Sequence, residues 1–256
     1  MKRSYNCELI YKKEIADGIF DFRINAPDIA SSAQCGQFLH IKCGEGTLLR
    51  RPVSICDTSD NTVRFIFEVR GKGTGELAAF KEGDFTDVLG PLGHGFTTDN
   101  GKYKNPVVIG GGIGVFPLFK LVKSLNDPTV FLGFRNKSRV VMSDEFAEYS
   151  KNVTIATDDG SFGYSGFAVE LLREHIKTSP ADIIYACGPM PMLRAVKAIA
   201  EEADILCEIS LEQRMGCGIG ACLVCSCETN RDGTDRYARV CKNGPVFLST
   251  EVTLND

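Results

Sequence analysis

Residues 217–225 read Cys217-Gly218-Ile219-Gly220-Ala221-Cys222-Leu223-Val224-Cys225, and a further cysteine, Cys241, follows downstream. Three cysteines spaced by four and then two residues, with a distant fourth, match the plant-type pattern of ligands to a [2Fe–2S] cluster. The glycines of this loop fit that interpretation, because a backbone that wraps a cluster must approach its sulfurs closely and point N–H groups at them. The stretch therefore predicts an iron–sulfur site on a small C-terminal domain.

A structural zinc site, which is also built from four cysteines, is the main alternative. Zinc ribbons usually pair two short Cys-x-x-Cys knuckles, whereas here one loop supplies three ligands and Cys241 stands alone. The spacing favours the cluster, and purely structural cysteines fit it least. Cys227 lies two residues beyond Cys225, on the same face if this stretch is a strand, and is the one competing ligand.

The composition limits the other possibilities. The 256 residues are 43% hydrophobic, which is enough for two modest cores or one large one, and the net charge of -4 gives no basic surface for nucleic acid. The N-terminus lacks the apolar core of a signal peptide and no long apolar segment occurs, so we expect a cytoplasmic protein outside the membrane. Eleven cysteines then favour metal ligation over disulfides. Five are expected to be small buried hydrophobes: Cys7, Cys35, Cys43, Cys56 and Cys207.

The first hundred residues predict an antiparallel barrel or sandwich. Short runs rich in β-branched and aromatic residues are separated by turn formers and occupy residues 8–11, 19–24, 38–43, 53–56 and 62–69. Glycines and a proline in residues 90–95 break this pattern, and residues 99–102 look like a linker. A first domain over residues 1–100 follows.

Strands and helices alternate after residue 100, which predicts a doubly wound parallel α/β domain over residues 101–207. The expected strands are residues 106–109, 129–134, 153–157 and 182–186, and the expected helices are residues 115–125, 143–149, 167–177 and 192–203. The rest, residues 208–256, holds the cysteine loop and a hairpin signal, Asp232-Gly233. It is expected to form the small cluster-binding domain.

The turn Gly110-Gly111-Gly112-Ile113-Gly114 joins a strand to a helix, where helix N–H groups can hold a pyrophosphate. It departs from the Rossmann fingerprint, because its third glycine position is Val115 or Phe116 and no acidic residue ends the next strand. A tight turn without a ligand is the alternative. The motif alone is therefore weak.

Two further segments are expected at the same carboxyl edge of the sheet. Cys187-Gly188-Pro189 follows one strand, and Asp158 follows another. An acidic residue there could accept hydrogen bonds from ribose hydroxyls and would repel a 2′-phosphate, which favours NADH over NADPH. A buried structural Cys187 and an ordinary turn at Asp158 are the alternatives.

The barrel region carries two possible phosphate-binding segments. Arg51-Pro52-Val53-Ser54 places a guanidinium and a hydroxyl beside a strand, and residues 70–75 form a glycine-rich stretch that contains Gly73 and Thr74. Arginine can hold a phosphate bidentately, and backbone N–H groups can supplement it. Taken singly, Arg51 could equally be a solvated or salt-bridged strand residue.

In order along almost the whole chain, these segments resemble the ferredoxin-NADP reductase family. They combine an arginine-x-x-serine strand with a glycine-threonine loop, a GGGIG turn and a cysteine-glycine-proline motif. Residues 210–222, which read SLEQRMGCGIGAC, are similar to one branch of that family, the electron-transfer subunits of NAD-linked, B-type dihydroorotate dehydrogenases. The resemblance implies a flavin-binding β-barrel, a nicotinamide domain and a [2Fe–2S] domain.

The resemblance also implies the residues at each cofactor. FAD would be held by Arg51, Pro52, Val53, Ser54, Phe67, Glu68, Gly73 and Thr74. NAD would be held by Gly110, Gly111, Gly112, Gly114, Asp158, Gly188 and Pro189, with Cys187 near the nicotinamide as the catalytic candidate. The cluster would be ligated by Cys217, Cys222, Cys225 and Cys241.

The implied function is electron transfer between NAD+ and a separate FMN-containing dihydroorotate dehydrogenase, in the synthesis of pyrimidines (UMP), within a heterotetramer of two copies of each chain. A separate catalytic subunit is required, because the three assigned domains leave no room for the about 250 residues of a TIM barrel. Two alternatives stay open. One is a flavin and iron–sulfur subunit of another NAD(P)H complex, of the ferredoxin:NADP oxidoreductase or sulfide dehydrogenase type. The other is a non-enzymatic sensor with a zinc-stabilised tail.

Overall fold

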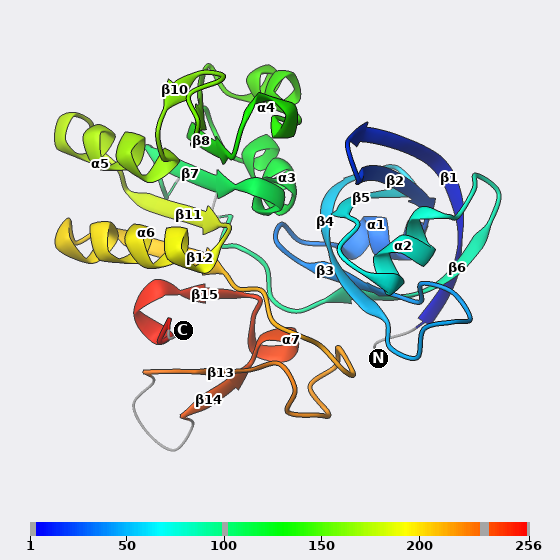
Figure 1. The fold of residues 1–256 in the computed structure, drawn as a ribbon. Helices are drawn as coiled ribbons and strands as arrows, with labels where there is room; N and C mark the ends of the chain where they lie inside the picture. Colours follow the sequence, from blue (N-terminus) through cyan, green and yellow to red (C-terminus); the bar gives the residue numbers. More distant parts are fainter. Residues whose placement is uncertain (1–3, 99–101, 231–235, 255–256) are drawn as a thin grey trace.

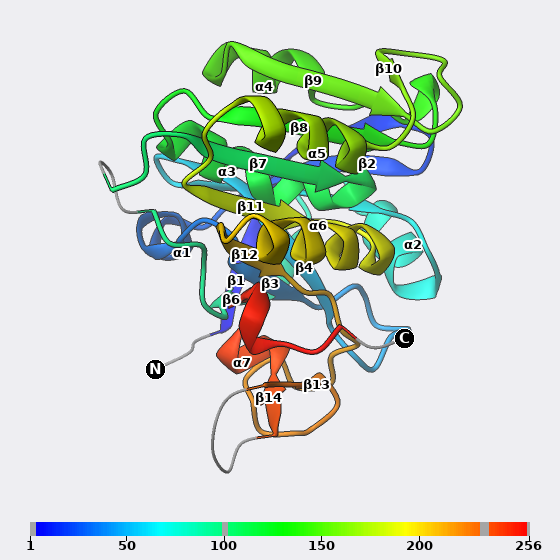
Figure 2. The ribbon, with the colours of Figure 1, turned by 90° about the vertical axis from the view of Figure 1, so that its left-hand side faces the viewer.

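A computed structural model of the chain describes residues 4–98, 102–230 and 236–254. Figure 1 shows a barrel built from the N-terminal part, an α/β sheet beside it, and a C-terminal segment below the junction of the two. Turned by 90°, Figure 2 shows the sheet with its helices stacked along the strands and the C-terminal segment at one end. The predicted multidomain β and α/β architecture is confirmed.

The barrel is closed and antiparallel, with the strand order β1-β2-β5-β4-β3-β6. Alternate side chains fill its interior, among them Phe22, Phe65 and Phe67, because successive residues of a strand point to opposite faces. Closure leaves no exposed sheet edge. Its elements are β1 (Ser4–Ala16), β2 (Ile19–Asn25), α1 (Pro27–Ser32), β3 (Phe38–Ile41), β4 (Arg51–Ser59), β5 (Thr62–Glu68), α2 (Lys72–Ala78) and β6 (Phe85–Leu92).

The second sheet has seven strands in the order β10-β9-β8-β7-β11-β12-β15, and all neighbours are parallel except β12 and β15. Its strands are β7 (Pro106–Gly111), β8 (Thr129–Phe134), β9 (Asn152–Thr157), β10 (Tyr164–Ser165), β11 (Ile183–Cys187), β12 (Leu206–Ser210) and β15 (Val246–Leu248). The carboxyl ends of β7, β8, β9 and β11 meet at one edge, where ligands bind in such sheets.

Helices cover both faces of this sheet. The connecting segments are η1 (Gly112–Val115), α3 (Phe116–Ser124), η2 (Lys137–Arg139), α4 (Ser143–Tyr149), α5 (Ala168–Thr178) and α6 (Met190–Glu202). Side chains of α3 and α4 share a core with Ile19, Cys56 and Ile66 of the barrel, so this face packs against the barrel. Side chains of α5 and α6 share the opposite core with the C-terminal segment, including Cys225 and Cys241.

The C-terminal segment contains β13 (Ser226–Glu228), β14 (Tyr237–Arg239), α7 (Val240–Asn243), β15 and η3 (Ser249–Glu251). The strands β13 and β14 pair antiparallel, and the Asp232-Gly233 turn predicted between them lies outside the described residues. Strand β15 joins the seven-stranded sheet through β12. The cysteine loop is thus tied to the large sheet by backbone hydrogen bonds. None of the described helices is long and apolar enough to cross a membrane.

The structure departs from the sequence interpretation in a few places. Residues 70–75 were expected to be a glycine-rich loop, but α2 begins within them at Lys72, because Thr74 closes a capping arrangement with Gly71. The strand β6 runs on to Leu92 through Gly90 and Pro91, where a break was expected. The short strands β10, β12 and β15 carry little periodic signal and were not predicted, and the barrel strand β6 was not predicted either. The five cysteines expected to be buried hydrophobes are buried.

Candidate functional site

The four predicted cluster cysteines form two pairs of sulfurs. The Sγ atoms of Cys217 and Cys222 lie 3.3 Å apart on the loop. Cys225 and Cys241 form the second pair, and the backbone N–H of Cys241 points at the Cys225 sulfur from 3.5 Å. The backbone N–H of Val240 donates to the carbonyl oxygen of Cys225, which ties the start of α7 to the loop. Cys241 is thereby brought to the loop although it is distant in sequence.

The loop backbone favours a thiolate at Cys217. Burial raises the pKa of this thiol, but N–H groups of Cys222, Ile219 and Ala221 outweigh it and lower the pKa to about 6. At Cys241, burial and the neighbouring Cys225 sulfur raise the pKa to about 12. Gly218 and Gly220 have φ values of +70° and +82°, which permit the loop to curl around the sulfurs. A cation or cluster would lower the second pKa by binding the thiolate form.

The arrangement fits a binuclear cluster better than a single zinc ion. Zinc requires four ligands around one centre, yet within residues 4–98, 102–230 and 236–254 no three His, Cys, Asp or Glu side chains converge on one point. Two irons instead need two separate pairs of thiolates, and two pairs are present. The competing residue, Cys227, lies on β13 opposite Ala238, inside the core shared with α5 and α6.

The glycine turn and the Cys187-Gly188 segment lie in contact, as the sheet topology predicts. Cys187 is paired with Gly110 across β11 and β7. A Cβ atom added to Gly114 would lie 2.5 Å from the carbonyl oxygen of Cys187, so only glycine permits this approach. Gly112 has a φ of +55° and is exposed, which turns the chain from β7 into η1. The two segments therefore form one surface at the carboxyl edge.

The other residues predicted to bind the dinucleotide lie beside this surface. Met192 of α6 fills the space left by Gly111 and Gly188, since a Cβ on either glycine would lie within 3 Å of its side chain. Pro189 is exposed directly after Gly188. Asp158 is exposed two strands away, at the end of β9, and its backbone N–H donates to Phe134.

Cys187 is held as a neutral thiol. The residue is partly exposed, yet burial of the sulfur raises its pKa to about 12, despite a hydrogen bond with the Ser210 side chain; the Glu212 carboxylate raises the pKa further. A thiol with this pKa carries almost no thiolate at neutral pH. Cys187 is therefore suited to packing against a ring and unsuited to nucleophilic attack.

Arg51 and the glycine-threonine segment meet on the outside of the barrel. A Cβ on Gly73 would lie 2.5 Å from Nε of Arg51, so the guanidinium lies directly over the start of α2. Nη1 of Arg51 donates to the carbonyl oxygen of Leu49 at 2.6 Å. The Thr74 hydroxyl accepts the N–H of Arg70 at 2.9 Å and so holds the segment. The Arg51 guanidinium and this segment thus form one cradle, and the guanidinium suits it to a phosphate.

The other predicted flavin residues divide between the two faces of the barrel. Pro52 and Ser54 are partly exposed on the outer face, whereas Val53 and Phe67 lie in the interior core and can offer only backbone atoms outside. Glu68 binds Arg70 at 2.7 Å and forms a short ion pair with Arg139 of η2, which lowers the pKa of its carboxyl against the effect of burial. Glu68 therefore joins the barrel to the second sheet.

The sequence interpretation missed His40, which lies in β3 opposite Pro52. Its residue surface is 0% exposed, and neither ring nitrogen finds a hydrogen-bond partner among the described residues. Burial, together with Arg50 and Arg51, lowers the pKa of His40 to about 4, against the nearby carbonyl groups of Arg50 and Cys217. A single histidine in a strand gives no periodic signal, so only the fold reveals it.

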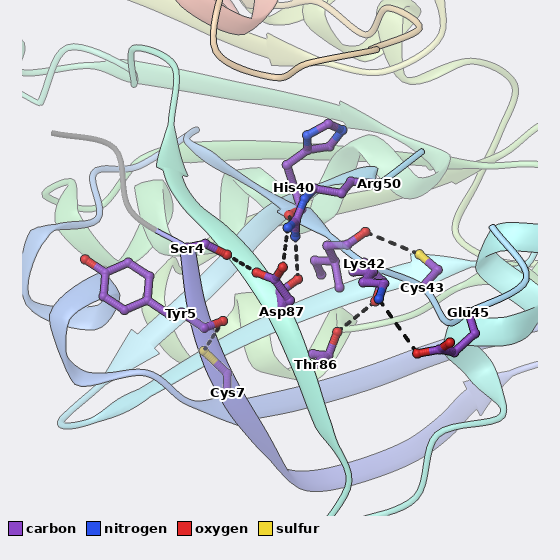
Figure 3. A network of polar contacts seen from close by, with 11 residues as sticks. Ser4, Tyr5, Cys7, His40, Lys42, Cys43, Glu45, Arg50, Thr86 and Asp87 are labelled. Atoms are coloured by element: carbon purple, nitrogen blue, oxygen red, sulfur yellow. Dashed lines mark hydrogen bonds and ion pairs between the residues drawn. The ribbon is translucent and has the colours of Figure 1, made fainter. Parts of the chain in front are cut away.

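Figure 3 shows the ring of His40 directed away from the polar network around Asp87. In that network Arg50 donates to the backbone oxygen of Asp87 at 2.7 Å and forms a short ion pair with its carboxylate. Ser4 also donates to this carboxylate, and both contacts lower its pKa although burial acts in the opposite direction. Arg50 is thus engaged within the barrel, while Arg51 remains at the cradle.

Two parts of the chain match described families. Residues 108–198 match the oxidoreductase NAD-binding domain. Residues 212–253 match the iron–sulfur cluster binding domain of dihydroorotate dehydrogenase B, and this range includes all four paired cysteines.

Two relatives that match over nearly the whole chain share one description. The dihydroorotate dehydrogenase B (NAD(+)) electron transfer subunit of Desulforamulus reducens is 39% identical, over 98% of this chain and 99% of that protein. The protein of the same description from Bacillus cereus is 40% identical, over 99% of this chain and 100% of its own length.

Solved structures agree with the architecture. A structure of an NADH-dependent reduced ferredoxin-NADP oxidoreductase, described in connection with electron bifurcation, superposes with a TM-score of 0.87 at 32% identity, over 99% of this chain and 92% of its own. The cytochrome b5 reductase domain of Ulva prolifera nitrate reductase gives a TM-score of 0.66 at 19% identity, over 79% and 94% of the two chains. This second likeness shows the fold alone.

Proposed function

This chain belongs to the family of dihydroorotate dehydrogenase B (NAD(+)) electron transfer subunits, and we propose that it carries electrons between an FMN-containing catalytic subunit and NAD+ in the cytoplasm. As a flavin and iron–sulfur oxidoreductase subunit of pyrimidine synthesis, it uses FAD, a [2Fe–2S] cluster and NAD. When bound, FAD exchanges a hydride with nicotinamide and single electrons with the cluster. The observation that carries the proposal is the double pairing of four cysteines beside a nicotinamide-type sheet and a barrel.

Each part of the chain has a distinct task in this function. Arg51, with Gly73 and Thr74, binds the phosphates of FAD, while Pro52 and Ser54 face its ring from the outer barrel surface. The backbone of Val53 and Phe67 supports this face, and Glu68 fixes the barrel against η2.

On the second sheet, the turn of Gly110, Gly111, Gly112 and Gly114 holds the dinucleotide together with Gly188 and Pro189. Asp158 accepts hydrogen bonds from a ribose and disfavours a 2′-phosphate, so NAD(H) is the expected nucleotide. Cys187 would pack beside the nicotinamide as a neutral thiol. A neutral thiol also does not act as a nucleophile toward the nicotinamide ring.

Cys217, Cys222, Cys225 and Cys241 ligate the cluster, and the N–H groups of the loop stabilise their negative charge. The loop also presents apolar side chains outward. Ile219 is 44% exposed, Leu223 is 73% exposed and Val224 is 57% exposed. Exposed apolar residues around a redox group are suited to docking the partner that exchanges electrons with it. We expect a heterotetramer with two copies of each subunit.

The test is copurification with the catalytic subunit, followed by an assay of NAD+ reduction that depends on dihydroorotate. We expect NADH formation by the complex and none by either subunit alone. A Leu223→Glu variant should lose the partner and the coupled activity, yet keep FAD, the cluster and flavin reduction by NADH. A complex that forms but never couples dihydroorotate to NAD+ would contradict the proposal.

The related structure of an NADH-dependent ferredoxin-NADP oxidoreductase favours a second candidate, a subunit of that type of complex. In that type we expect an aspartate among the cluster ligands, whereas four cysteines complete the set here. Reduction of NADP+ with ferredoxin, and not with dihydroorotate, by the complex isolated from cells would support this second candidate.

A further inference from the structure

His40 is a buried polar side chain that none of the roles above uses. Its surface is fully covered, and within the described part of the chain Nδ1 and Nε2 both lack a hydrogen-bond partner. A buried polar group without a partner destabilises the folded state, so native proteins keep such groups for a reason. The carbonyl groups of Arg50 and Cys217 lie near the ring without completing a hydrogen bond, so the ring can still bind a group outside the polypeptide.

The position of His40 shows which group this is. Its strand neighbours Leu39 and Ile41 belong to the interior core of the barrel, so His40 points outward. It is paired with Pro52 across β3 and β4, on the outer face that also carries Ser54. The imidazole therefore lies next to the face proposed for the flavin ring.

The other side of the imidazole is covered by the cysteine loop. A Cβ added to Gly218 would lie 2.5 Å from Nδ1 of His40 and 3.2 Å from Cε1, so the backbone of the loop rests on the ring. The carbonyl group of Cys217 lies near the ring as well, without completing a hydrogen bond within the described chain. In Figure 3 the ring points toward this loop and away from Asp87.

The charged neighbours do not satisfy the ring. Arg50 and Arg51 are the charged groups that act on it, and guanidinium groups cannot accept its N–H. Arg50 is already bound to Asp87, and Arg51 lies over Gly73. The ring N–H is thus free to donate to an acceptor on the loop side.

We propose that His40 is a positioning residue for the cluster, which holds the cysteine loop against the flavin face through Gly218 and donates its ring N–H to the sulfur shell of the cluster. This inference rests on the proposed function, because it takes the four cysteines of the two pairs as the cluster ligands. A residue of the barrel then helps to set the reduction potential of the cluster. The loop glycine and the barrel histidine then act as one contact between two domains.

The expected effect follows from the chemistry of iron–sulfur sites. Hydrogen bonds to the sulfurs stabilise the added negative charge of the reduced cluster and raise its reduction potential. Loss of this N–H should therefore move the potential to a more negative value. The flavin should be affected less, since the ring N–H is directed at the loop.

The test compares His40→Leu, which keeps the bulk but not the donor, with His40→Gln, which keeps an N–H donor. Both are measured in the full-length protein by redox titration of the cluster with EPR detection. We expect a more negative midpoint for His40→Leu, a midpoint near wild type for His40→Gln, and wild-type contents of FAD and iron. The matched control is His175→Leu, because His175 lies on α5 and its ring packs against Phe131 of β8; the cluster midpoint should not change.

An unchanged cluster midpoint in His40→Leu, an equal shift in His40→Gln, or a shift confined to the flavin would each overturn the inference. If His40→Leu does not fold, pulsed EPR of the reduced wild-type protein labelled with 15N-histidine replaces it. We expect a 15N coupling that disappears in His40→Gln, and its absence from the wild type would contradict the proposal. If the cluster midpoint shifts in His40→Leu but the wild-type complex fails the coupled dihydroorotate assay, only the proposed partner is contradicted. The role of His40 would then stand.

Discussion

The cysteine loop and the Cys187 segment are two cysteine sites of one chain with opposite electrostatics. In the loop, backbone N–H groups lower the pKa of Cys217 to about 6, although burial acts in the other direction. At the end of β11, burial dominates and the pKa of Cys187 rises to about 12. The difference shows that backbone N–H groups favour a thiolate ligand at one site, whereas burial keeps the thiol neutral at the other.

The largest expected effect comes from removing one of the proposed cluster ligands in the cysteine loop. Cys222→Ser should abolish the cluster, because one sulfur of the Cys217–Cys222 pair is lost, while FAD stays bound and is still reduced by NADH. Iron analysis and the absorption spectrum of the purified variant measure both. Cys227→Ser is the matched control and should keep the cluster, since Cys227 lies in the β13–β14 pairing. Loss of FAD along with the cluster would show that the two sites are not separate.

The raised pKa of Cys187 is tested by alkylation. At pH 8, iodoacetamide should modify Cys187 about a hundredfold more slowly in the folded protein than in guanidinium, because its raised pKa leaves little thiolate; higher nucleophilicity offsets part of that loss. Mass spectrometry of the peptide that carries Cys187 gives both rates. The folded-state rate should rise with pH well above pH 9. A modification rate that levels off by about pH 10 would mean that Cys187 is an ordinary thiol with a pKa of about 8.5.

The contact between the glycine turn and Cys187 predicts a smaller effect on stability. Gly114→Ala should destabilise the protein by about 1–3 kcal/mol, because its Cβ would overlap the Cys187 carbonyl group, and should weaken flavin reduction by NADH. Urea denaturation and NADH titration measure the two effects. Gly71→Ala is a suitable control, since a Cβ there meets nothing within 4 Å. Equal stability of the two variants would contradict the close approach of Gly114 to the Cys187 carbonyl group.

The smallest effect is expected at the ion pairs that join the two halves. Glu68→Gln should cost about 1 kcal/mol or less at pH 7, since Glu68 lies near the surface. Its folded-state pKa is lowered by Arg70 and Arg139, so its contribution is present above the unfolded pKa and is lost as the pH falls below it. Urea midpoints between pH 7 and pH 3 should therefore fall less for the variant. Cluster content should not change, because Glu68 pairs with Arg70 and with Arg139 of η2 and with none of the four cluster cysteines.

The sequence predicted the fold wherever a period or a motif was present. The runs of the barrel and the βα units of the sheet were located correctly, and α4 (Ser143–Tyr149) was predicted with its bounds. Strands β12 and β15 were missed, since short segments whose partners lie far along the chain have no local signal. The helix α2 was missed because two glycines mask a turn that Thr74 caps.

The candidate site was predicted where the chemistry of a motif is local. The order of the cysteines identified the cluster, but not that their sulfurs form two pairs. His40 could not be found, because its meaning depends on Gly218, which is distant in sequence and approaches only in the folded chain. Likewise, the engagement of Glu68 with Arg139 requires the packing of one domain on another.

The most direct test of the account is an anaerobic titration of the purified chain with NADH or dithionite, followed by absorbance and EPR. We predict that each chain takes up one electron more than its flavin alone can hold, and that this electron gives the EPR signal of a reduced [2Fe–2S] cluster. A chain that takes up only the electrons of its flavin and contains zinc instead of iron would contradict it.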